Sequence, residues 1–192
     1  MSGIELIVGL GNPEPKYLMT RHNAGFWFVD HVVDKLSVAL RVETKFKGEV
    51  GGGVVNSRKI RFLKPLTYMN NSGQAVAALA NFYKIPLASI LVVYDDMDFD
   101  PGVIRLKHGG SAGRHNGVQS MIECLGGKDF WRLRLGVGHP GDRAKVTGFV
   151  LGKPSESDFT LMSEAVLDGA SSLTELIEGD FQKVMGELHT KK

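Results

Sequence analysis

Two short apolar runs, residues 4–10 and 90–94, constrain the fold of this chain more than any other feature. Each is too short for a typical helix and is almost free of polar side chains, a pattern that indicates a strand buried in the core. Strands buried on both faces belong to sheets that helices cover on both sides. The first run leads into a turn around Gly11 and Asn12, and the second leads directly into Asp95, so polar residues follow both predicted strands.

Helical patterns recur along the rest of the chain. A helix after His22 is predicted by apolar residues at helical spacing, which are Phe26, Val29, Val33, Leu36 and Leu40. We expect Ser72 to cap a second helix, which Pro86 stops. Two more helices are predicted over residues 116–125 and 159–177.

Further strands are expected between these helices. Residues 50–55 and 60–63 have the pattern of a hairpin. Residues 103–107, 131–137 and 146–151 are predicted to add strands, the last of which closes the sheet. Because strands alternate with helices, the sequence predicts an α/β protein, with a single globular domain over residues 1–192 and a twisted mixed β-sheet flanked by helices.

The composition is that of an ordinary globular protein. With 192 residues, of which 43% are hydrophobic and 23% charged, the chain is long enough to bury a core without disulfides. Cys124 is its one cysteine, which fits a reducing compartment. No apolar run approaches the roughly 18 residues of a membrane span, and the N-terminus has no evident export signal. We therefore expect a cytoplasmic protein that has no membrane partner.

Charge is unevenly distributed along the chain. The formal net charge is only +2, but residues 103–145 contain eight Lys and Arg against three Asp and Glu. Residues 155–182 contain seven acidic residues and no Lys or Arg. This asymmetry predicts one positive face, which would attract a phosphate backbone. The alternative is a solvated charged surface that has no specific partner.

Motifs for a dinucleotide cofactor or a metal ion are incomplete. The Gly9-x-Gly11 pair lacks the third glycine of the dinucleotide fingerprint. The run Asp96-x-Asp98-x-Asp100 lacks the glycine and the glutamate of a calcium loop, and a turn is its better interpretation, although two carboxylates could hold Mg²⁺ weakly. Histidines in predicted loops have no cysteine partners at metal spacing. The sequence therefore predicts no cofactor and no resident metal.

The run from Gly109 to Gly113 leaves two interpretations open. It matches the G-x-S-x-G motif of serine hydrolases, with Ser111 as the nucleophile. Its neighbours Lys107 and Arg114 are basic, and a basic loop of small residues fits phosphate contacts through backbone N–H groups better.

His22 is the strongest candidate for catalysis. A neutral imidazole can take a proton from water near pH 7. Asp95 ends a predicted strand, and ligand sites of α/β proteins lie at the carboxyl ends of strands. Asp95 can accept a hydrogen bond from one ring nitrogen, which leaves the other free as a base. Asparagines at junctions between strands and helices can hold a substrate without competing for the proton, and these are Asn12, Asn70 and Asn116.

Several collinear segments make the chain similar to the bacterial-type peptidyl-tRNA hydrolases. The first is Ile7-Val8-Gly9-Leu10-Gly11-Asn12-Pro13, and together they cover residues 7–13, 20–25, 64–73, 94–98, 115–117, 132–141 and 149–154. The resemblance extends over essentially the whole chain, in order. It implies an esterase that cuts the bond between the C-terminal carboxyl of a peptide and the 3′-terminal ribose of tRNA, and so recycles tRNA for translation.

The resemblance also implies roles for particular residues. His22 is expected to be the general base that activates water, with Asp95 supporting the imidazole and Asn12 discriminating blocked from free aminoacyl-tRNA. The expected contacts to the peptide backbone and the terminal adenosine are Tyr17, Tyr68, Asn70 and Asn116. The expected contacts to tRNA phosphates are Arg105, Lys107, Arg134 and Arg143. The family needs no metal and is usually monomeric.

Three functions therefore remain to be separated. The first is hydrolysis of peptidyl-tRNA by His22. The second is binding of tRNA by the positive face without catalysis. The third is a serine hydrolase that uses Ser111.

Overall fold

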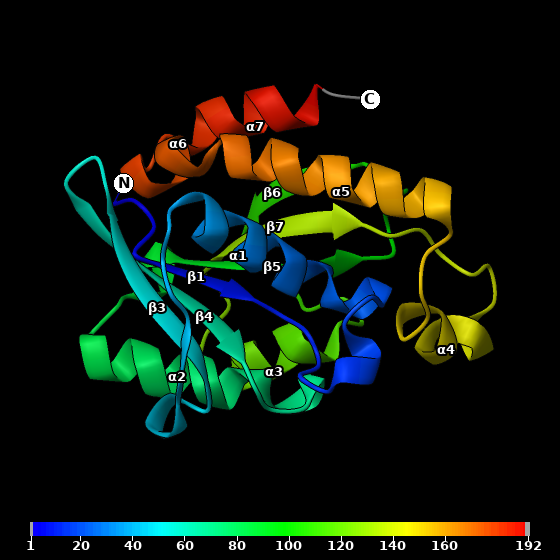
Figure 1. Ribbon diagram of the computed structural model, residues 1–192, viewed down its shortest axis with the longest axis horizontal. Coiled ribbons are helices and arrows are strands. Elements are labelled where there is room, and N and C mark those ends of the chain that lie inside the picture. The colour runs from blue at the N-terminus through cyan, green and yellow to red at the C-terminus, as the bar shows by residue number, and fades with distance from the viewer. Residues whose placement is uncertain (1, 191–192) are drawn as a thin grey trace.

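A computed structural model, which describes residues 2–190, contains one mixed sheet of seven strands (Figure 1). The strand order is β2-β3-β4-β1-β5-β7-β6. The bounds are β1 Leu6–Gly9, β2 Arg41–Glu43, β3 Gly48–Val55, β4 Arg58–Pro65, β5 Ile90–Asp96, β6 Ile104–His108 and β7 Trp131–Gly136. Strands β4, β1, β5 and β7 are parallel to their neighbours in that series, whereas β2, β3 and β6 are added antiparallel. The predicted fold class and hairpin are confirmed.

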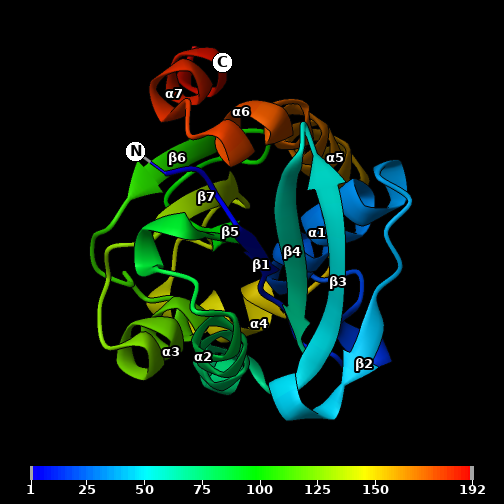
Figure 2. The ribbon, with the colours of Figure 1, turned by 90° about the vertical axis from the view of Figure 1, so that its left-hand side faces the viewer.

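Helices cover both faces of the sheet, as the unbroken apolar runs predict (Figure 2). One face packs against α1 Ala24–Lys35, α5 Glu156–Ser171, α6 Leu173–Glu178 and α7 Phe181–His189. The other packs against α2 Ser72–Tyr83 and α3 Asn116–Leu125. Alternate residues of β1 divide between the two cores, since Ile7 packs with Phe28 of α1 while Leu6 and Val8 pack with Leu79 of α2.

The predicted helix after His22 is shorter than its apolar spacing indicates, since α1 ends at Lys35 and Leu40 lies beyond it. Three other expectations about local structure are wrong. Residues 146–151 do not close the sheet, because Val146–Val150 forms a short helix, α4. Its apolar residues Val146, Phe149 and Val150 have helical spacing, a pattern that so short a run does not distinguish from a strand. The long helix over residues 159–177 is divided into α5 and α6 at Ser172.

The third error concerns the start of α2. Ser72 is the first residue of the helix, not its cap, and its hydroxyl donates backward to the carbonyl oxygen of Met69. Asn71 occupies the N-cap position without a side-chain cap. A short 3-10 turn, Met69–Asn71, leads into the helix and supplies this alternative partner.

The start of α1 lies unusually close to the ends of β1 and β5. A Cβ atom at Gly25 would collide with the carbonyl oxygen of Val93 and the backbone nitrogen of Leu10. Glycine therefore lets the helix begin directly against the two strand ends. The turn Arg21–Asn23, which precedes α1, is brought over the carboxyl end of β5, and His22 and Asp95 meet there.

Candidate active site

A pocket of about 890 Å³ opens at the carboxyl ends of the central strands. It collects most of the residues that the sequence predicts for the site, which are Asn12, Tyr17, His22, Tyr68, Asn70, Asp95, Lys107, Asn116 and Arg134. Arg105 and Arg143 do not line it. These residues come from the segments after β1 and β4, from the end of β5, from the start of α3 and from the neighbouring strands β6 and β7. The parallel arrangement of the central strands thus brings distant segments to one edge of the sheet.

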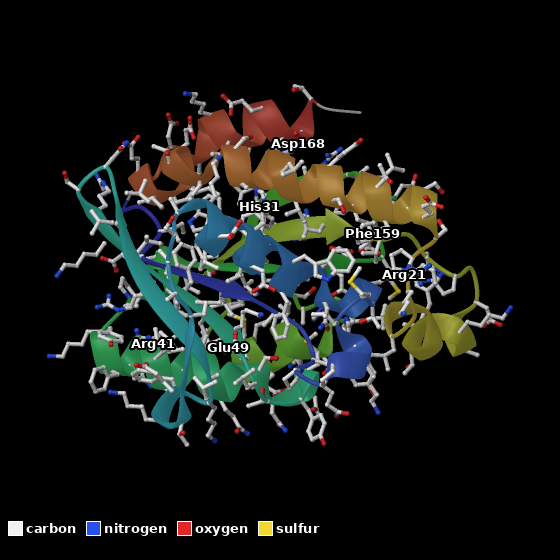
Figure 3. The ribbon with its side chains drawn as sticks, viewed as in Figure 1. Arg21, His31, Arg41, Glu49, Phe159 and Asp168 are labelled. Atoms are coloured by element: carbon white, nitrogen blue, oxygen red, sulfur yellow. The ribbon has the colours of Figure 1, made fainter. Side chains whose placement is uncertain are left out.

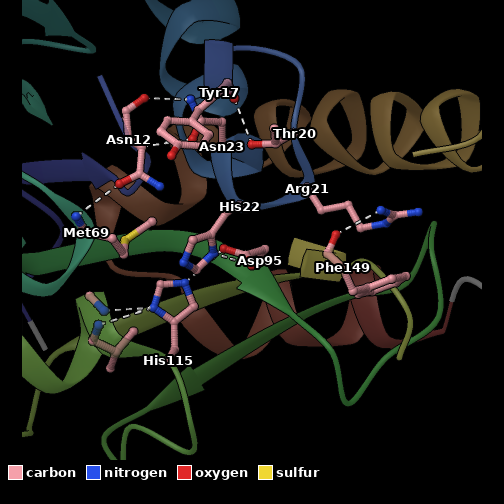
Figure 4. A network of polar contacts seen from close by, with 12 residues as sticks. Asn12, Tyr17, Thr20, Arg21, His22, Asn23, Met69, Asp95, His115 and Phe149 are labelled. Carbon is pink, nitrogen blue, oxygen red and sulfur yellow. Dashed lines mark hydrogen bonds and ion pairs between the residues drawn. The ribbon is translucent and has the colours of Figure 1, made fainter. Parts of the chain in front are cut away.

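His22 and Asp95 form a hydrogen-bonded pair (Figure 4). Nδ1 of His22 lies 2.8 Å from Oδ2 of Asp95, whose side chain is only 2% exposed. Because an ionised carboxylate only accepts hydrogen bonds, Nδ1 carries a proton in this pair. The lone pair of a neutral His22 ring is therefore on Nε2, which forms no hydrogen bond within residues 2–190 and lies on a ring that lines the pocket.

A second histidine, His115, occupies the other oxygen of Asp95. Its Nε2 lies 2.9 Å from Oδ1 of Asp95, and its Nδ1 accepts hydrogen bonds from the backbone N–H groups of Gly117 and Val118. His115 is thereby the N-cap of α3. Since Nδ1 accepts, Nε2 must be the nitrogen that donates to Asp95. Both ring nitrogens of His115 are thus engaged, and its ring centroid is 4.9 Å from that of His22.

The three side chains shift one another's protonation. Burial opposes the charged form of His22, but the charge of Asp95 and the hydrogen bond to it prevail, so the pKa of His22 lies above its usual value of 6.5. Burial likewise opposes the charged form of Asp95, yet the two histidines hold the pKa of this carboxyl well below its ordinary range. Asp95 therefore stays ionised wherever the fold persists near neutral pH.

Asn12 is held in one orientation by three hydrogen bonds. Its backbone N–H donates to Oδ1 of Asn23 at 2.8 Å, and Nδ2 of Asn23 donates back to the carbonyl oxygen of Asn12 at 3.0 Å. Oδ1 of Asn12 accepts from the N–H of Met69 at 3.1 Å. The amide oxygen of Asn12 is thereby engaged, and its NH₂ group is directed to the side on which His22 lies (Figure 4).

Arg132 fixes the glycine-rich loop beside the pocket. It is 1% exposed, and its guanidinium donates to the carbonyl oxygens of Ser111, Gly110 and Lys128 at 2.5, 2.6 and 3.2 Å. Such a buried cation is stabilised by the several carbonyl dipoles around it. Because this loop leads into His115 and α3, Arg132, which itself lines the pocket, fixes the wall of the site instead of presenting charge to solvent.

The charged residues predicted to meet phosphates are dispersed. Lys107 and Arg134 line the pocket, and Arg134 lies 3.8 Å from Asp96. Arg105 instead donates to the carbonyl oxygen of its neighbour Ile104. Arg143 is exposed in a short turn before α4. A large polyanion could contact all four, but only Lys107 and Arg134 can reach a ligand inside the pocket.

Comparisons with known proteins agree with this arrangement. The family model described as peptidyl-tRNA hydrolase matches residues 6–192. The chain belongs to the peptidyl-tRNA hydrolase family. It is 48% identical over 188 residues to a peptidyl-tRNA hydrolase of Coxiella burnetii, covering 98% of both chains, and 48% identical to one from Methylobacillus flagellatus, covering 100% and 99%. A crystal structure of the Acinetobacter baumannii peptidyl-tRNA hydrolase superposes with a TM-score of 0.97 at 44% identity, covering 100% of this chain and 97% of that one. The family expected from the sequence motifs is confirmed.

The rival chemistries gain little from the geometry of this family member. Oγ of Ser111 accepts a hydrogen bond from the N–H of Gly113, and no histidine bonds to it within residues 2–190. His22, Asp95 and His115 are close enough to hold a metal ion, with ligand atoms within 4.8 Å of one another. A metal bound between them would have to displace the protons that both rings donate to Asp95, so the set fits a hydrogen-bonded triad better than a metal site.

Three residues lie within the segments shared with the family, but their roles were not predicted from the sequence. His115 is one of the loop histidines to which the sequence assigned no role, although its position just before a predicted helix is that of an N-cap. Asn23, which the sequence left without a role, is 1% exposed and holds the backbone of Asn12. Arg132 and Arg134 alternate with apolar residues along β7, a pattern that predicts both on one charged face, yet Arg132 is buried.

Proposed function

We propose that this chain hydrolyses the ester bond between a peptide and the 3′-terminal ribose of tRNA, and so releases free tRNA for reuse in translation. The observation that carries the proposal is the free Nε2 of His22 in a pocket, on a ring whose Nδ1 is held by a buried carboxylate. Membership of the peptidyl-tRNA hydrolase family supplies the substrate class. Residues 1–192 act as a single domain, as a monomer in the cytoplasm.

His22 acts as the general base. Its Nε2 removes a proton from water while the water oxygen attacks the ester carbonyl carbon. Asp95 keeps the proton on Nδ1 and stabilises the imidazolium that forms, as the aspartate does in a catalytic triad. When the bond from the carbonyl carbon to the ribose oxygen breaks, the imidazolium returns its proton to that oxygen. Water and ester are thus converted to a carboxylic acid and a free ribose hydroxyl.

Neutral amides hold the acyl group. The NH₂ of Asn12 donates to the developing oxyanion, a contribution of about 3–4 kcal/mol for one side-chain donor in another hydrolase. Asn70 and Asn116 form hydrogen bonds with the peptide backbone. Because these bonds involve no peptide side chain, the site accepts peptides of any sequence. Tyr17 and Tyr68 present flat rings to the terminal adenosine, and the exposed ring of Tyr68 suits stacking.

Cations hold the tRNA. Lys107 and Arg134 contact phosphates close to the ester, and Arg105 and Arg143 contact phosphates farther along the acceptor arm. Such contacts do not depend on the nucleotide sequence, so the affinity for every tRNA should fall to a similar extent as the salt concentration is raised. No cofactor or metal takes part in the proposed reaction.

The decisive experiment is ester release from an N-blocked aminoacyl-tRNA by the wild type and by His22→Ala. We expect His22→Ala to lose about 10²–10⁴-fold in kcat, the usual contribution of a positioned general base. His31→Ala, on α1, is the matched control and should retain wild-type turnover. Near-normal turnover by His22→Ala would remove His22 as the base.

The two other functions give different results in the same assays. A tRNA-binding protein without catalysis would bind the RNA, but the wild type would release no ester. A serine hydrolase would be labelled covalently by a fluorophosphonate, and the label would be lost in Ser111→Ala.

A further inference from the structure

A second concentration of positive charge lies away from the pocket, at the opposite edge of the sheet. Residues 41–64 contain seven Lys and Arg but only two Glu. One of the two glutamates, Glu49, is paired with Lys64. Strands β2, β3 and β4 form this edge, whereas Lys107 and Arg134 belong to β6 and β7 at the other. The pocket lies between the two edges, at the ends of β1 and β5.

Strand register puts three of these cations on one face. Arg41 pairs with Val50, which pairs with Leu63, and Leu63 packs in the core that contains α2. Residues that pair across strands share a face, as do alternate residues along one strand. Lys59 and Arg61 therefore lie on the same face as Leu63 and Arg41, beside α2. Figure 3 labels Arg41 on this side of the molecule.

Two aromatic rings at the end of α2 complete the surface. Phe82 is 58% exposed and Tyr83 is 36% exposed, although large aromatic side chains usually bury most of their area. Nζ of Lys45 lies 4.4 Å from the centroid of Phe82, and the guanidinium carbon of Arg61 lies 3.6 Å from that of Tyr83. Phe46, which is buried, packs edge-on against Phe82 from beneath. The rings are thus supported and oriented, not loosely exposed.

In the described part of the chain, five cations of this surface lack the acidic partners that Lys64 has, and these are Arg41, Lys45, Lys59, Arg61 and Lys84. None of these five side chains forms an ion pair with a carboxylate of residues 2–190. The α2–β4 surface, as we name it, consists of Arg41, Lys45, Lys59, Arg61, Phe82, Tyr83 and Lys84. Unpaired cations interleaved with supported, exposed rings are the two components of a surface for unpaired nucleic acid, in which phosphates meet the cations and bases stack on the rings.

We propose that the α2–β4 surface binds single-stranded RNA that is separate from the acceptor arm in the pocket. Phosphates contact Arg41, Lys45 and Arg61, and a base stacks on the exposed face of Phe82. Gly52, which pairs with Arg61, leaves the adjoining sheet surface flat, since a Cβ there would approach only the carbonyl oxygen of Ile60, at 3.8 Å. The protein would therefore hold two RNA segments at once, one at each edge of its sheet.

The test measures binding of a fluorescent oligouridylate of twelve nucleotides by the full chain, with deacylated tRNA present at saturation to occupy the pocket. Phe82→Leu keeps an apolar side chain over Phe46 but removes the stacking ring, and we expect it to weaken binding about tenfold. Phe82→Trp should restore binding. Leu167→Ala removes a similarly exposed apolar side chain from α5 and should have no effect.

A charge variant tests the phosphate contacts separately. Lys45→Gln with Arg61→Gln should reduce the slope of log affinity against log salt by about 1.4, since each phosphate contact to a single strand contributes roughly 0.7. Lys35→Gln with Lys183→Gln changes the net charge equally and should leave the slope unchanged. Ester release should remain at the wild-type level in all these variants, so failure here is distinguishable from failure of the proposed enzyme activity.

Three results would overturn the proposal. The first is an affinity for the oligouridylate that falls in the charge variant but not in Phe82→Leu. That result would mean that RNA is held only by nonspecific electrostatic attraction. The second is displacement of the oligouridylate by tRNA, which would assign the binding to the pocket. The third concerns polyglutamate, a model of an acidic protein. If polyglutamate binds with the same affinity as the RNA, and Phe82→Leu changes neither affinity, the surface has no preference for RNA.

Discussion

His22 and His115 contact the two oxygens of one carboxylate, yet their surroundings give them different capacities. His22 comes from the turn before α1 and keeps one nitrogen free in the pocket. His115 comes from the start of α3, and both of its nitrogens are engaged, one by Asp95 and the other by backbone N–H groups. Only His22 can exchange a proton with a ligand without breaking a bond of the fold.

The difference shows that the role of a histidine is set by the partner of its second nitrogen. His115 takes part of the hydrogen-bonding capacity of Asp95 and so moderates how strongly the carboxylate attracts the proton of His22. In the proposed mechanism, Asp95 therefore connects the residue that performs the chemistry to one that positions it. Each of the following changes separates these two contributions.

Asp95→Asn should have the largest effect. An asparagine has one acceptor and one donor group, so it cannot accept from both imidazoles, and one ring must change its tautomer or rotate. We expect kcat for N-blocked aminoacyl-tRNA to fall roughly 10²–10⁴-fold, because a triad whose base has the wrong tautomer loses a comparable factor. The affinity for deacylated tRNA, measured in parallel, should change little. A loss of affinity with intact turnover would contradict the role of Asp95.

His115→Asn should have a smaller effect. Asparagine is a good N-cap, so α3 keeps its cap while the hydrogen bond to Asp95 is lost. We expect kcat to fall about tenfold, the value of one hydrogen bond to a charged group, with KM nearly unchanged. His139→Asn is the matched control within the same pocket, since Nδ1 of His139 also accepts a backbone hydrogen bond, from Gly141, but His139 belongs to no ion pair or hydrogen bond of the triad. Equal losses in the two variants would show that His115 has no special function.

Much of this comparison could be predicted from the sequence, but not all. The apolar runs before Asn12 and Asp95 require two buried strands, and parallel strands must bring their carboxyl ends together, so the meeting of these residues with His22 follows from the fold. The partner of His115 does not follow, because it depends on how loop 109–115 folds. That path is set by Arg132, whose burial is a tertiary contact that strand alternation cannot reveal.

The pH profile of the wild type tests how Asp95 acts on His22. The base must be neutral, so kcat/KM should rise with pH through a midpoint above 6.5, because Asp95 raises the pKa of His22. In Asp95→Asn the charge is gone while burial remains, so the midpoint should fall below that of the wild type. In His115→Asn the midpoint should rise, since Asp95 loses a hydrogen bond and attracts the proton of His22 more strongly. A midpoint that is the same in all three proteins would mean that the pH profile does not report the titration of His22.

Arg134→Ala should have the smallest effect on the chemistry. It tests whether a cation outside the triad influences the protonation of His22. Arg134 faces Asp96, not Asp95, so its loss should leave the midpoint of the pH profile unchanged. Its expected effect is on tRNA binding, where losing one phosphate contact reduces the salt slope by about 0.9. Lys35→Ala, at the C-terminal end of α1, removes an equal charge and should leave the slope unaltered. A shifted midpoint in Arg134→Ala would mean that the phosphate-binding cations and the two histidines form one electrostatic unit, and that binding of tRNA itself adjusts the protonation of His22.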